Sequence, residues 1–296
     1  MKKSGVIIGV TIVGFLLWYL AIKPYDFLVT FKVKANAGTI NQTLKLWNNS
    51  LENHKPMVQE NLKNLVQQIQ TNDSVYTYHW AIHSLNDSIS QVKVYVKDKN
   101  YSLQNKISIP FSNTDFEKTT TKTVRNFVEE LKRHLKEIKI KLEGISKTKA
   151  TYCAYVSVKA KQIEKAKGMM QNYGFLDSFI ASNGIKTNGT PFIEVTNWDL
   201  ENDLLEYNFC FPILKNDSLP KLENVKYKQL KSVKAIKAIY NGNYITSDRA
   251  WYALLDYANK NGVSVDKKPV EFFYNNPNMG GDALQWKTEV YLPIKN

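Results

Sequence analysis

An internal repeat in the C-terminal half constrains the fold of this 296-residue chain more than any other feature of its sequence. Two stretches share an apolar helix end, an Asn-Gly pair and a proline seven residues after the glycine: LDSFIASNGIKTNGTPFIEV, residues 176–195, and ALLDYANKNGVSVDKKPVEFF, residues 253–273. Gly184 therefore corresponds to Gly262, and Pro191 to Pro269. Because glycine adopts positive φ at little energetic cost, it commonly ends helices. The repeat predicts two helices that end at equivalent glycines.

Each repeat also begins and ends with a segment typical of a strand. The halves open at TYCAYVSV and VKAIKAIYNG, and both close on a strand that ends in Pro-Ile. The predicted unit is strand, helix, strand, strand, used over residues 151–214 and again over residues 225–296. Two such units can pair their sheets about a pseudo-twofold axis. We therefore expect an α+β domain with one joint antiparallel sheet, both helices on one face, and a groove between the helices.

Three motifs make residues 151–296 resemble the gyrase-inhibitor-like fold, which is also called the bacterial transcription-activator effector-binding domain. They are the Gly-x-Tyr of Gly242 and Tyr244, the helix AWYALLDYANKNGV, and the closing Glu-x-Tyr-x-Pro-Ile that starts at Glu289. In that family a glutamate on the last strand lies at the base of an aromatic pocket and faces cationic, lipophilic ligands. The resemblance implies this role for Glu289 and a small-molecule effector as partner, and it implies no cofactor.

The residues around Glu289 fit this role on physical grounds. Glu289 and Tyr291 are two residues apart, so they share one face of a strand. We expect Glu289 to point into the groove between the two helices. A carboxylate among aromatic rings suits a bulky organic cation, because each ring adds a cation–π contact of about 0.5–2 kcal/mol. Asn208 takes the place of Glu289 in the first repeat. The candidate ligand-binding residues are Glu289, Tyr291, Trp286, Tyr244, Trp251, Phe273 and Asn208. Alternatively, Glu289 points to water beside Lys287.

Two other functions remain open. Some gyrase-inhibitor-like proteins are hydrolases, and Glu289 with Tyr291 or Tyr244 could act as base and orienting donor on a small electrophilic ligand. A groove filled by a partner segment, or by its own side chains, would instead indicate a protein-interaction module. We favour binding over catalysis, because the sequence has no Ser-His-Asp, Cys-His or metal-binding arrangement.

Histidines and cysteines give no metal pattern. His79 and His83 would share a strand face but have no third ligand nearby, and Cys153 and Cys210 are not at metal-binding spacing. No metal site is expected. The two cysteines are interpreted as buried free thiols, with a disulfide as the alternative if this part of the chain is exported.

Residues 25–143 are expected to form a separate α+β domain, joined to the C-terminal one by a linker at 144–150. The pattern predicts a strand over 27–38, helices from Thr39 and over 58–69, strands over 75–82, 89–96 and 106–111, and a long helix over 116–142. This order resembles the START-like, polyketide-cyclase-like helix-grip superfamily, in which a curved sheet wraps a long C-terminal helix around a hydrophobic cavity. The segment is a strand or two short of that pattern, so a packing domain without a ligand cavity remains the alternative.

Residues 1–24 are predicted to form a membrane anchor. The uncharged run from Gly5 to Ile22 would span about 27 Å as a helix, close to the hydrocarbon thickness of a bilayer. A cleaved signal peptide and a buried helix are the alternatives. Lys2 and Lys3 favour a cytoplasmic N-terminus, which would leave the body of a single-pass protein on the non-cytoplasmic side.

The net charge of +13 raises the possibility of nucleic-acid binding. The lysines, however, are spread along the whole chain and arginine is nearly absent, although arginine is the usual residue for reading bases and phosphates. We therefore expect a solvated lysine surface and no nucleic-acid partner.

Overall fold

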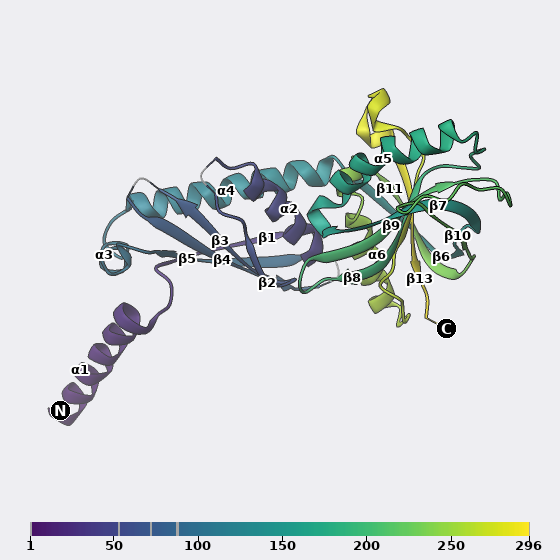
Figure 1. The fold of residues 1–296 in the computed structure, drawn as a ribbon. Coiled ribbons are helices and arrows are strands. Elements are labelled where there is room, and N and C mark those ends of the chain that lie inside the picture. Colours follow the sequence, from purple (N-terminus) through teal and green to yellow (C-terminus); the bar gives the residue numbers. More distant parts are fainter. Residues whose placement is uncertain (1, 53, 72, 87–88, 296) are drawn as a thin grey trace. The chain divides into compact units, whose positions relative to one another are not determined.

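The chain forms two compact units that divide between Leu131 and Lys132. The computed structural model describes residues 2–52, 54–71, 73–86 and 89–295. Each unit is built around its own antiparallel sheet, with helices packed against it (Figure 1). The predicted α+β class is confirmed.

The N-terminal segment is helical. α1 (Lys2–Leu17) continues into a π-helix, η1 (Trp18–Ile22). Across the part of the chain that the structure describes, none of the helices combines the length and the apolar character needed to cross a membrane. The predicted transmembrane helix is therefore not supported, and the location of the body on the non-cytoplasmic side stays a prediction.

The first unit contains a five-stranded sheet among its described residues, in the order β1-β5-β4-β3-β2. Its elements are β1 (Phe27–Val33), α2 (Ala37–Asn49), β2 (Val58–Asn61), β3 (Asn64–Gln70), β4 (Val75–Ser84), β5 (Ser90–Asp98), α3 (Ser102–Ser108) and α4 (Asp115–Lys136). The strand, helix, strands and long final helix follow the order expected of a helix-grip domain.

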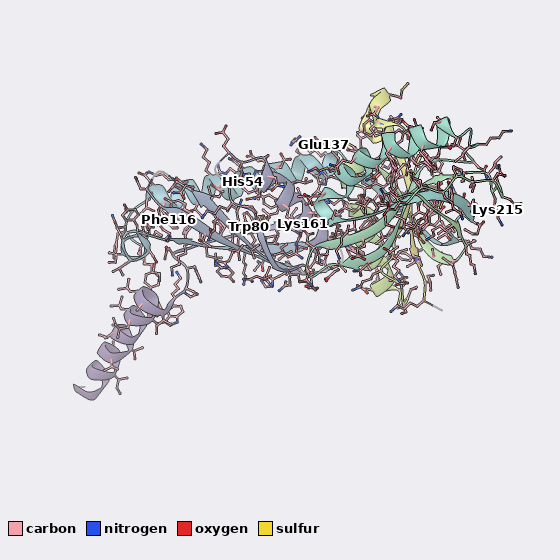
Figure 2. All side chains as sticks on the ribbon, viewed as in Figure 1. His54, Trp80, Phe116, Glu137, Lys161 and Lys215 are labelled. Carbon is pink, nitrogen blue, oxygen red and sulfur yellow. The ribbon has the colours of Figure 1, made fainter. Side chains whose placement is uncertain are left out.

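Aromatic rings fill the space between this sheet and its helices. Trp80 lies on β4, between the sheet and its helices (Figure 2). Its ring contacts Phe127 on α4 at 5.0 Å between ring centroids and Trp47 on α2 at 6.4 Å. Trp47 and Phe127 also contact each other at 5.4 Å, and all three side chains are buried. Because both helices contact the same ring, α2 and α4 lie on the same face of the sheet. These three rings thus fill the centre of the interface between the sheet and its helices.

Two predicted elements of this unit are wrong, and a third is too long. The helix predicted over 58–69 is the hairpin of β2 and β3, whose turn at 62–63 gives apolar residues a helix-like spacing although burial along β3 alternates. The strand predicted over 106–111 is instead the end of α3 and a turn. Lys106 is buried there because its ammonium donates to the carbonyls of Leu20 and Lys23, at 3.3 and 2.5 Å. The helix predicted over 116–142 ends at Lys136, and a strand follows it.

The second unit contains both predicted repeats. The first comprises β7 (Thr151–Lys161), α5 (Lys165–Ser182), β8 (Phe192–Asp199) and β9 (Leu204–Pro212), and the second comprises β11 (Lys234–Asn241), α6 (Arg249–Lys260), β12 (Val270–Phe273) and β13 (Lys287–Pro293). Gly184 and Gly262, at the helix ends, both have φ of +62°. The duplicated strand-helix-strand-strand unit is confirmed.

An additional strand precedes each repeat, and the two repeats exchange these strands. They are β6 (Lys139–Lys147) and β10 (Lys226–Leu230). The described strands form one eight-stranded antiparallel sheet in the order β10-β7-β9-β8-β12-β13-β11-β6. β6 therefore pairs with β11 of the second repeat, and β10 pairs with β7 of the first. The pairing of β8 with β12 marks the pseudo-twofold axis.

The short links after the exchanged strands require a strongly curved sheet. β6 and β7 are six strand positions apart, which is about 29 Å in a flat sheet at ~4.8 Å per strand. The chain from Lys147 to Thr151 reaches at most about 14 Å. β10 and β11 are also six strand positions apart, and the chain from Leu230 to Lys234 is equally short. The edges of the sheet must therefore curl toward each other, on the face that the two links cross.

Both helices of this unit pack against one face of the sheet. Lys165, the first residue of α5, and Trp251 on α6 each contact the carboxylate of Glu271, at 2.8 and 2.6 Å. Glu271 lies on β12, at the centre of the sheet. Because one side chain reaches both helices, α5 and α6 lie on the same face, as predicted from the repeat.

Candidate ligand-binding site

Glu289 and Glu271 divide the central sheet into two faces. Glu271 points toward α5 and α6, and we call that side the helix face. Phe272, the next residue of β12, contacts Phe192 and Tyr291 at ring distances of 5.0 and 5.9 Å. Tyr291 donates a hydrogen bond to Glu289 on the same strand at 3.0 Å. Since neighbouring residues of a strand point to opposite sides, these residues lie on the other side, which we call the Glu289 face.

The carboxylate of Glu289 is surrounded by cations. Oε2 lies 2.8 Å from the ammonium of Lys149, and Oε1 lies 3.0 Å from that of Lys287 and 3.4 Å from that of Lys237. Tyr274 donates a further hydrogen bond to Oε2 at 2.8 Å. The side chain of Glu289 is only 8% exposed. The predicted pairing of Glu289 with Tyr291 is present, and the alternative of a glutamate pointing to water is wrong.

These contacts set the charge of Glu289. Burial alone would raise the pKa of this carboxyl, but hydrogen bonds from lysine and tyrosine outweigh burial and hold the pKa well below its usual range. The donors are Lys149, Tyr274, Lys287 and Tyr291. Glu289 is therefore ionised, and its single negative charge faces three positive ones.

Aromatic rings accompany each of these lysines. The ammonium of Lys149 lies 4.7 Å from the ring centroid of Tyr274 and 5.3 Å from that of Phe272. Lys287 lies 4.7 Å from the Tyr274 centroid, and Lys237 lies 5.6 Å from that of Tyr291. Phe272 and Tyr274 were not among the predicted site residues. Their signal was the run FFY after Val270 and Glu271, of which only Phe273 was chosen.

Asn208 occupies the equivalent place in the first repeat, as the alignment of the two Pro-Ile ends predicted. Its amide donates to Glu194 Oε2 at 3.0 Å, and its carbonyl accepts from Ser157 at 2.9 Å. Lys228 on β10 contacts the same oxygen of Glu194. Glu194 and Asn208 both lie on the Glu289 face, because Glu194 is two residues from Phe192 on β8. The acid here is therefore Glu194, which aligns with Phe272 and not with Glu289, and it has one lysine where Glu289 has three.

A cavity of about 390 Å³ opens on the Glu289 face. Its apolar walls include Leu230, Val233 and Val270, and Glu194 lies at its edge. Val270 and Leu230 pack in one cluster with Phe272 and Tyr291. The cavity is thus next to the Glu289 cluster on the same side of the sheet.

The remaining four predicted site residues lie apart from Glu289. Trp251 contacts Glu271 on the helix face, and Phe273 follows Phe272 on β12 and so points the opposite way. Tyr244, in the short helix η3 (Tyr244–Thr246), packs against Phe273 at 4.9 Å and against Trp286 at 5.8 Å. Our prediction that Glu289 points into a groove between the helices is therefore wrong. The spacing of a strand shows which residues share a face, but it does not show which face the helices cover.

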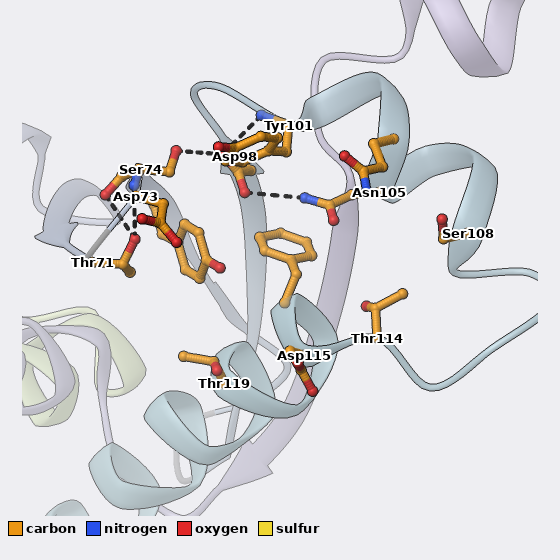
Figure 3. Close-up of a pocket in the computed structure, with 13 residues that line it drawn as sticks. Thr71, Asp73, Ser74, Asp98, Tyr101, Asn105, Ser108, Thr114, Asp115 and Thr119 are labelled. Atoms are coloured by element: carbon orange, nitrogen blue, oxygen red, sulfur yellow. Dashed lines mark hydrogen bonds between the residues drawn. The ribbon is translucent and has the colours of Figure 1, made fainter.

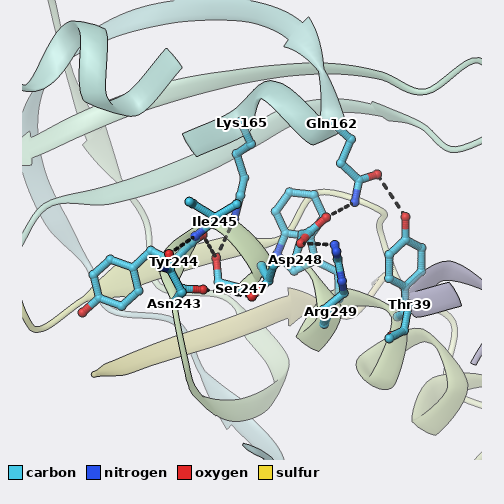
Figure 4. A network of polar contacts seen from close by, with 12 residues as sticks. Thr39, Gln162, Lys165, Asn243, Tyr244, Ile245, Ser247, Asp248 and Arg249 are labelled. Atoms are coloured by element: carbon cyan, nitrogen blue, oxygen red, sulfur yellow. Dashed lines mark hydrogen bonds and ion pairs between the residues drawn. The ribbon is translucent and has the colours of Figure 1, made fainter. Parts of the chain in front are cut away.

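Buried polar groups fill the space where that groove was expected. Lys165 Nζ contacts Glu271 Oε2 at 2.8 Å and Ser247 Oγ at 2.5 Å, and Trp251 Nε1 donates to Glu271 Oε1 at 2.6 Å (Figure 4). Lys165 and Glu271 are 1% and 0% exposed. Burial raises the pKa of Glu271, and the charge of Lys165 opposes that rise. This ion pair was not among the predicted sites, although Glu271 lies among apolar residues just as Glu289 does.

A second buried network adjoins the first. Arg249 Nη1 donates to Asp248 Oδ1 at 2.8 Å, and Gln162 Nε2 donates to Asp248 Oδ2 at 2.6 Å (Figure 4). Gln162 Oε1 in turn accepts from Trp198 at 2.8 Å and from Tyr252 at 3.1 Å. These contacts join the starts of α5 and α6 on the helix face.

The two cysteines are free and buried, on β7 and β9. Both belong to the cluster on the Glu289 face. Burial and the neighbouring Cys153 raise the pKa of Cys210 well above its usual range. The predicted free thiols are confirmed.

The first unit has a cleft of its own, of about 490 Å³, between the start of α4, α3 and the ends of β4 and β5 (Figure 3). The carboxylate of Asp98 is buried in its wall and accepts from Ser74 at 2.5 Å, Asn100 at 2.9 Å and Asn105 at 3.2 Å. These hydrogen bonds tie β5 to the turn before β4 and to α3. Asp98 thus has a structural role.

Solved structures with a similar arrangement include the C-terminal domain of EcmrR, at 16% identity and a TM-score of 0.40, covering 54% of this chain and 98% of that one. SAV2435 bound to tetraphenylphosphonium matches at 12% identity and a TM-score of 0.38, covering 53% and 94%. The di-domain ARO/CYC protein BexL, from the BE-7585A biosynthetic pathway, matches at 8% identity and a TM-score of 0.27, covering 91% and 85%.

No curated protein matches the chain. The model of the GyrI-like small molecule binding domain matches residues 145–295, just over half of the chain. This range holds both repeats, the exchanged strand β10, the Glu289 cluster and the cavity beside it. The chain therefore belongs to the family of proteins with a GyrI-like small molecule binding domain.

Proposed function

We propose that the protein binds a lipophilic small molecule with a cationic group, and that this ligand occupies the Glu289 face of the second unit. The observation that carries the proposal is the position of Glu289 among the rings of Phe272, Tyr274 and Tyr291, beside a cavity of about 390 Å³. Small-molecule sites are commonly apolar cavities of about 300–1,000 Å³ with a few convergent polar groups.

The contacts of the three lysines support a cationic ligand. Each ammonium lies near an aromatic ring and within 3.4 Å of the same carboxylate. Rings and a carboxylate together stabilise a positive charge that has lost part of its water. The apolar walls formed by Leu230, Val233 and Val270 would take the lipophilic part of the same molecule.

The low pKa of Glu289 argues against the hydrolase alternative. A general base works best when its pKa lies near the operating pH, and the contacts of Glu289 hold its pKa far below that. The helix face offers no replacement, because Lys165 and Glu271 are buried there. Binding on the Glu289 face is the function that the geometry supports best.

Isothermal titration of the full-length protein with benzyltrimethylammonium tests the proposal. The neutral comparison is neopentylbenzene, in which carbon replaces the charged nitrogen. We expect the cation to bind, and Glu289→Gln to weaken it by roughly 1–3 kcal/mol, the range for losing a charge-assisted contact. The neutral compound should be much less affected by this substitution.

Glu206→Gln is the matched control. Glu206 also pairs with a lysine on this sheet, Lys159 at 2.7 Å, but its side chain is 39% exposed. This variant should bind the cation as the parent does. If Glu289→Gln and Glu206→Gln bind the cation equally well, Glu289 is not the ligand-binding acid. If neither compound binds the parent protein, the proposed function is wrong.

A further inference from the structure

Lys149 reaches Glu289 from the link between β6 and β7, residues 148–150. Thr148, the residue before Lys149, holds this link in place. The N–H of Thr148 donates to the carbonyl of Val233 at 2.9 Å, and its Oγ1 accepts from the N–H of Val233 at 2.9 Å. Val233 belongs to the equivalent link before β11. The two links therefore meet where they cross the concave side of the sheet, and Lys149 points from this crossing to Glu289.

The ammonium of Lys149 has the surroundings that a bound organic cation would have. It lies 2.8 Å from Glu289 Oε2, 5.3 Å from the ring centroid of Phe272 and 4.7 Å from that of Tyr274. It also contacts the hydroxyl of Tyr274. Carboxylate, ring faces and a phenol oxygen together replace much of the water around a cation.

We propose that Lys149 is an internal competitor, a tethered ammonium that occupies the cation position of the Glu289 face until a ligand displaces it. The inference rests on the proposed function and adds how the site is regulated. The incoming cation takes the place of an outgoing one, so the exchange leaves the charge around Glu289 unchanged. Without this exchange, a fourth cation would have to join three that already surround Glu289, where Glu143 beside Lys237 is the other acid.

The other two lysines are less suited to leave. Lys237 is on β11 with its side chain only 17% exposed, and it has a second acidic partner, Glu143 at 3.1 Å. Lys287 is on β13, two residues before Glu289, and contacts the other carboxylate oxygen, Oε1. Lys149 alone of the three comes from a link and not from a strand. Its side chain is 46% exposed, close to the 43% of Lys287, so its place on the link and not its exposure sets it apart. Its backbone, outside the strands, can move with the side chain without breaking a strand pairing.

Displacement of Lys149 would also loosen a segment. Its side chain joins the link of residues 148–150 to β12 and β13 through Phe272 and Glu289. Once a ligand holds those residues, the link loses these contacts and keeps the hydrogen bonds of Thr148 to Val233 and Ser232. Ligand binding would thus change the contacts of the junction between β6 and β7.

The test compares Lys149→Met with Lys287→Met in full-length protein, by titration with benzyltrimethylammonium. Each variant removes one positive charge within about 3 Å of Glu289 and keeps a side chain of similar length. We expect Lys149→Met to bind the cation about 3- to 15-fold more tightly than the parent, from the loss of a partly exposed ion pair and a cation–π contact. Lys287→Met should gain clearly less. Lys159→Met, at the exposed pair with Glu206, is the control and should bind like the parent.

A second readout follows Lys149 directly. Acetic anhydride acetylates free amines, and mass spectrometry gives the rate at each lysine. Saturating benzyltrimethylammonium should speed acetylation of Lys149 and leave that of Lys287 unchanged or slower. Equal gains in affinity for the two methionine variants, or unchanged acetylation of Lys149, would overturn the inference and leave the proposed function standing. Failure of the parent and of every variant to bind the cation would overturn both.

Discussion

Glu271 and Glu289 lie on adjacent strands of one sheet, and their carboxylates point to opposite faces. Glu271 is fully buried and paired with one lysine, Lys165. Glu289 is reached by three lysines, two of them with side chains more than 40% exposed. The same sheet thus carries a closed ion pair under its helices and an accessible cluster of charges on its concave side. The first holds the fold together, and the second is where we place the ligand.

Breaking the buried ion pair of Lys165 and Glu271 should cause a large loss of stability. Glu271→Gln would leave the Lys165 ammonium buried without its acid, and such changes lower the free energy of unfolding by about 3–5 kcal/mol. Urea denaturation measures this loss. The double variant Lys165→Met, Glu271→Leu should recover part of it, because an apolar pair avoids the desolvation of two charges, while Trp251 Nε1 loses its acceptor. A double variant that is less stable than Glu271→Gln would contradict this account of the pair.

The lowered pKa of His134 should make the stability of the protein depend on pH. Burial, aided by the charge of Arg249 and opposed by that of Asp248, lowers the pKa of His134 to about 4. The unfolded chain, with a pKa near 6.5, therefore binds more protons between these two values. The contribution of His134 to stability is full above pH 6.5 and is lost as the pH falls toward 4, by about 3 kcal/mol in total.

His134→Gln should remove this dependence. Urea denaturation of both proteins at pH 7.5 and pH 5 gives the comparison, since carboxylates present in both contribute equally to the difference. The parent should lose more stability between these pH values than the variant does. Equal losses would show that His134 does not titrate in this window.

At Gly168, α5 approaches the sheet too closely to leave room for a side chain. A Cβ at this position would lie 2.4 Å from the hydroxyl of Tyr207 and 3.0 Å from Cγ1 of Val158. Gly168→Ala should therefore lower the free energy of unfolding by about 1–3 kcal/mol through overpacking. Adding Tyr207→Phe should recover part of the loss, because it removes the atom that the new methyl group meets. A double-mutant cycle by urea denaturation measures this coupling.

Gly174 provides the matched control in the same helix. A Cβ there has open space around it within 4 Å. Gly174→Ala should raise the stability by about 0.5–1 kcal/mol, because alanine loses less backbone entropy than glycine in a helix. If both substitutions had the same effect, the close contact at Gly168 would not govern the packing of α5.

The sequence predicted the duplicated unit because its signals are local. The glycines that end α5 and α6, and the strands that close in Pro-Ile, follow from backbone preferences of a few residues. The two-residue period of a strand, applied to β13, correctly placed Glu289 and Tyr291 on one face. Residues 139–147 were taken as the end of a helix because Ile138 and Leu142 continue the apolar stripe of α4. Long-range pairing with β11, which no local signal reports, makes this segment the exchanged strand β6.

The location of the site depended on such long-range relations. Residue spacing put Glu289 and the aromatic residues of η3 and α6 in one group, although the sheet separates them. Lys149 lay in what was read as a linker, and only the exchange of β6 and β10 brings it over Glu289. The partners of Glu271 come from α5 and α6, more than 15 residues away in sequence, so its pairing could not be predicted from the strand VEFF alone.

The central claim is that the ligand binds on the concave Glu289 face and not between the helices. A photoreactive benzophenone that carries a trimethylammonium group tests it most directly, with irradiation of the full-length protein and mapping of the labelled residues by mass spectrometry. We predict labels on residues 148–150, on Phe272 or Tyr274, and on Tyr291, all reduced by excess benzyltrimethylammonium. Competed labels confined to residues between α5 and α6, such as Trp251 and Tyr252, would contradict it.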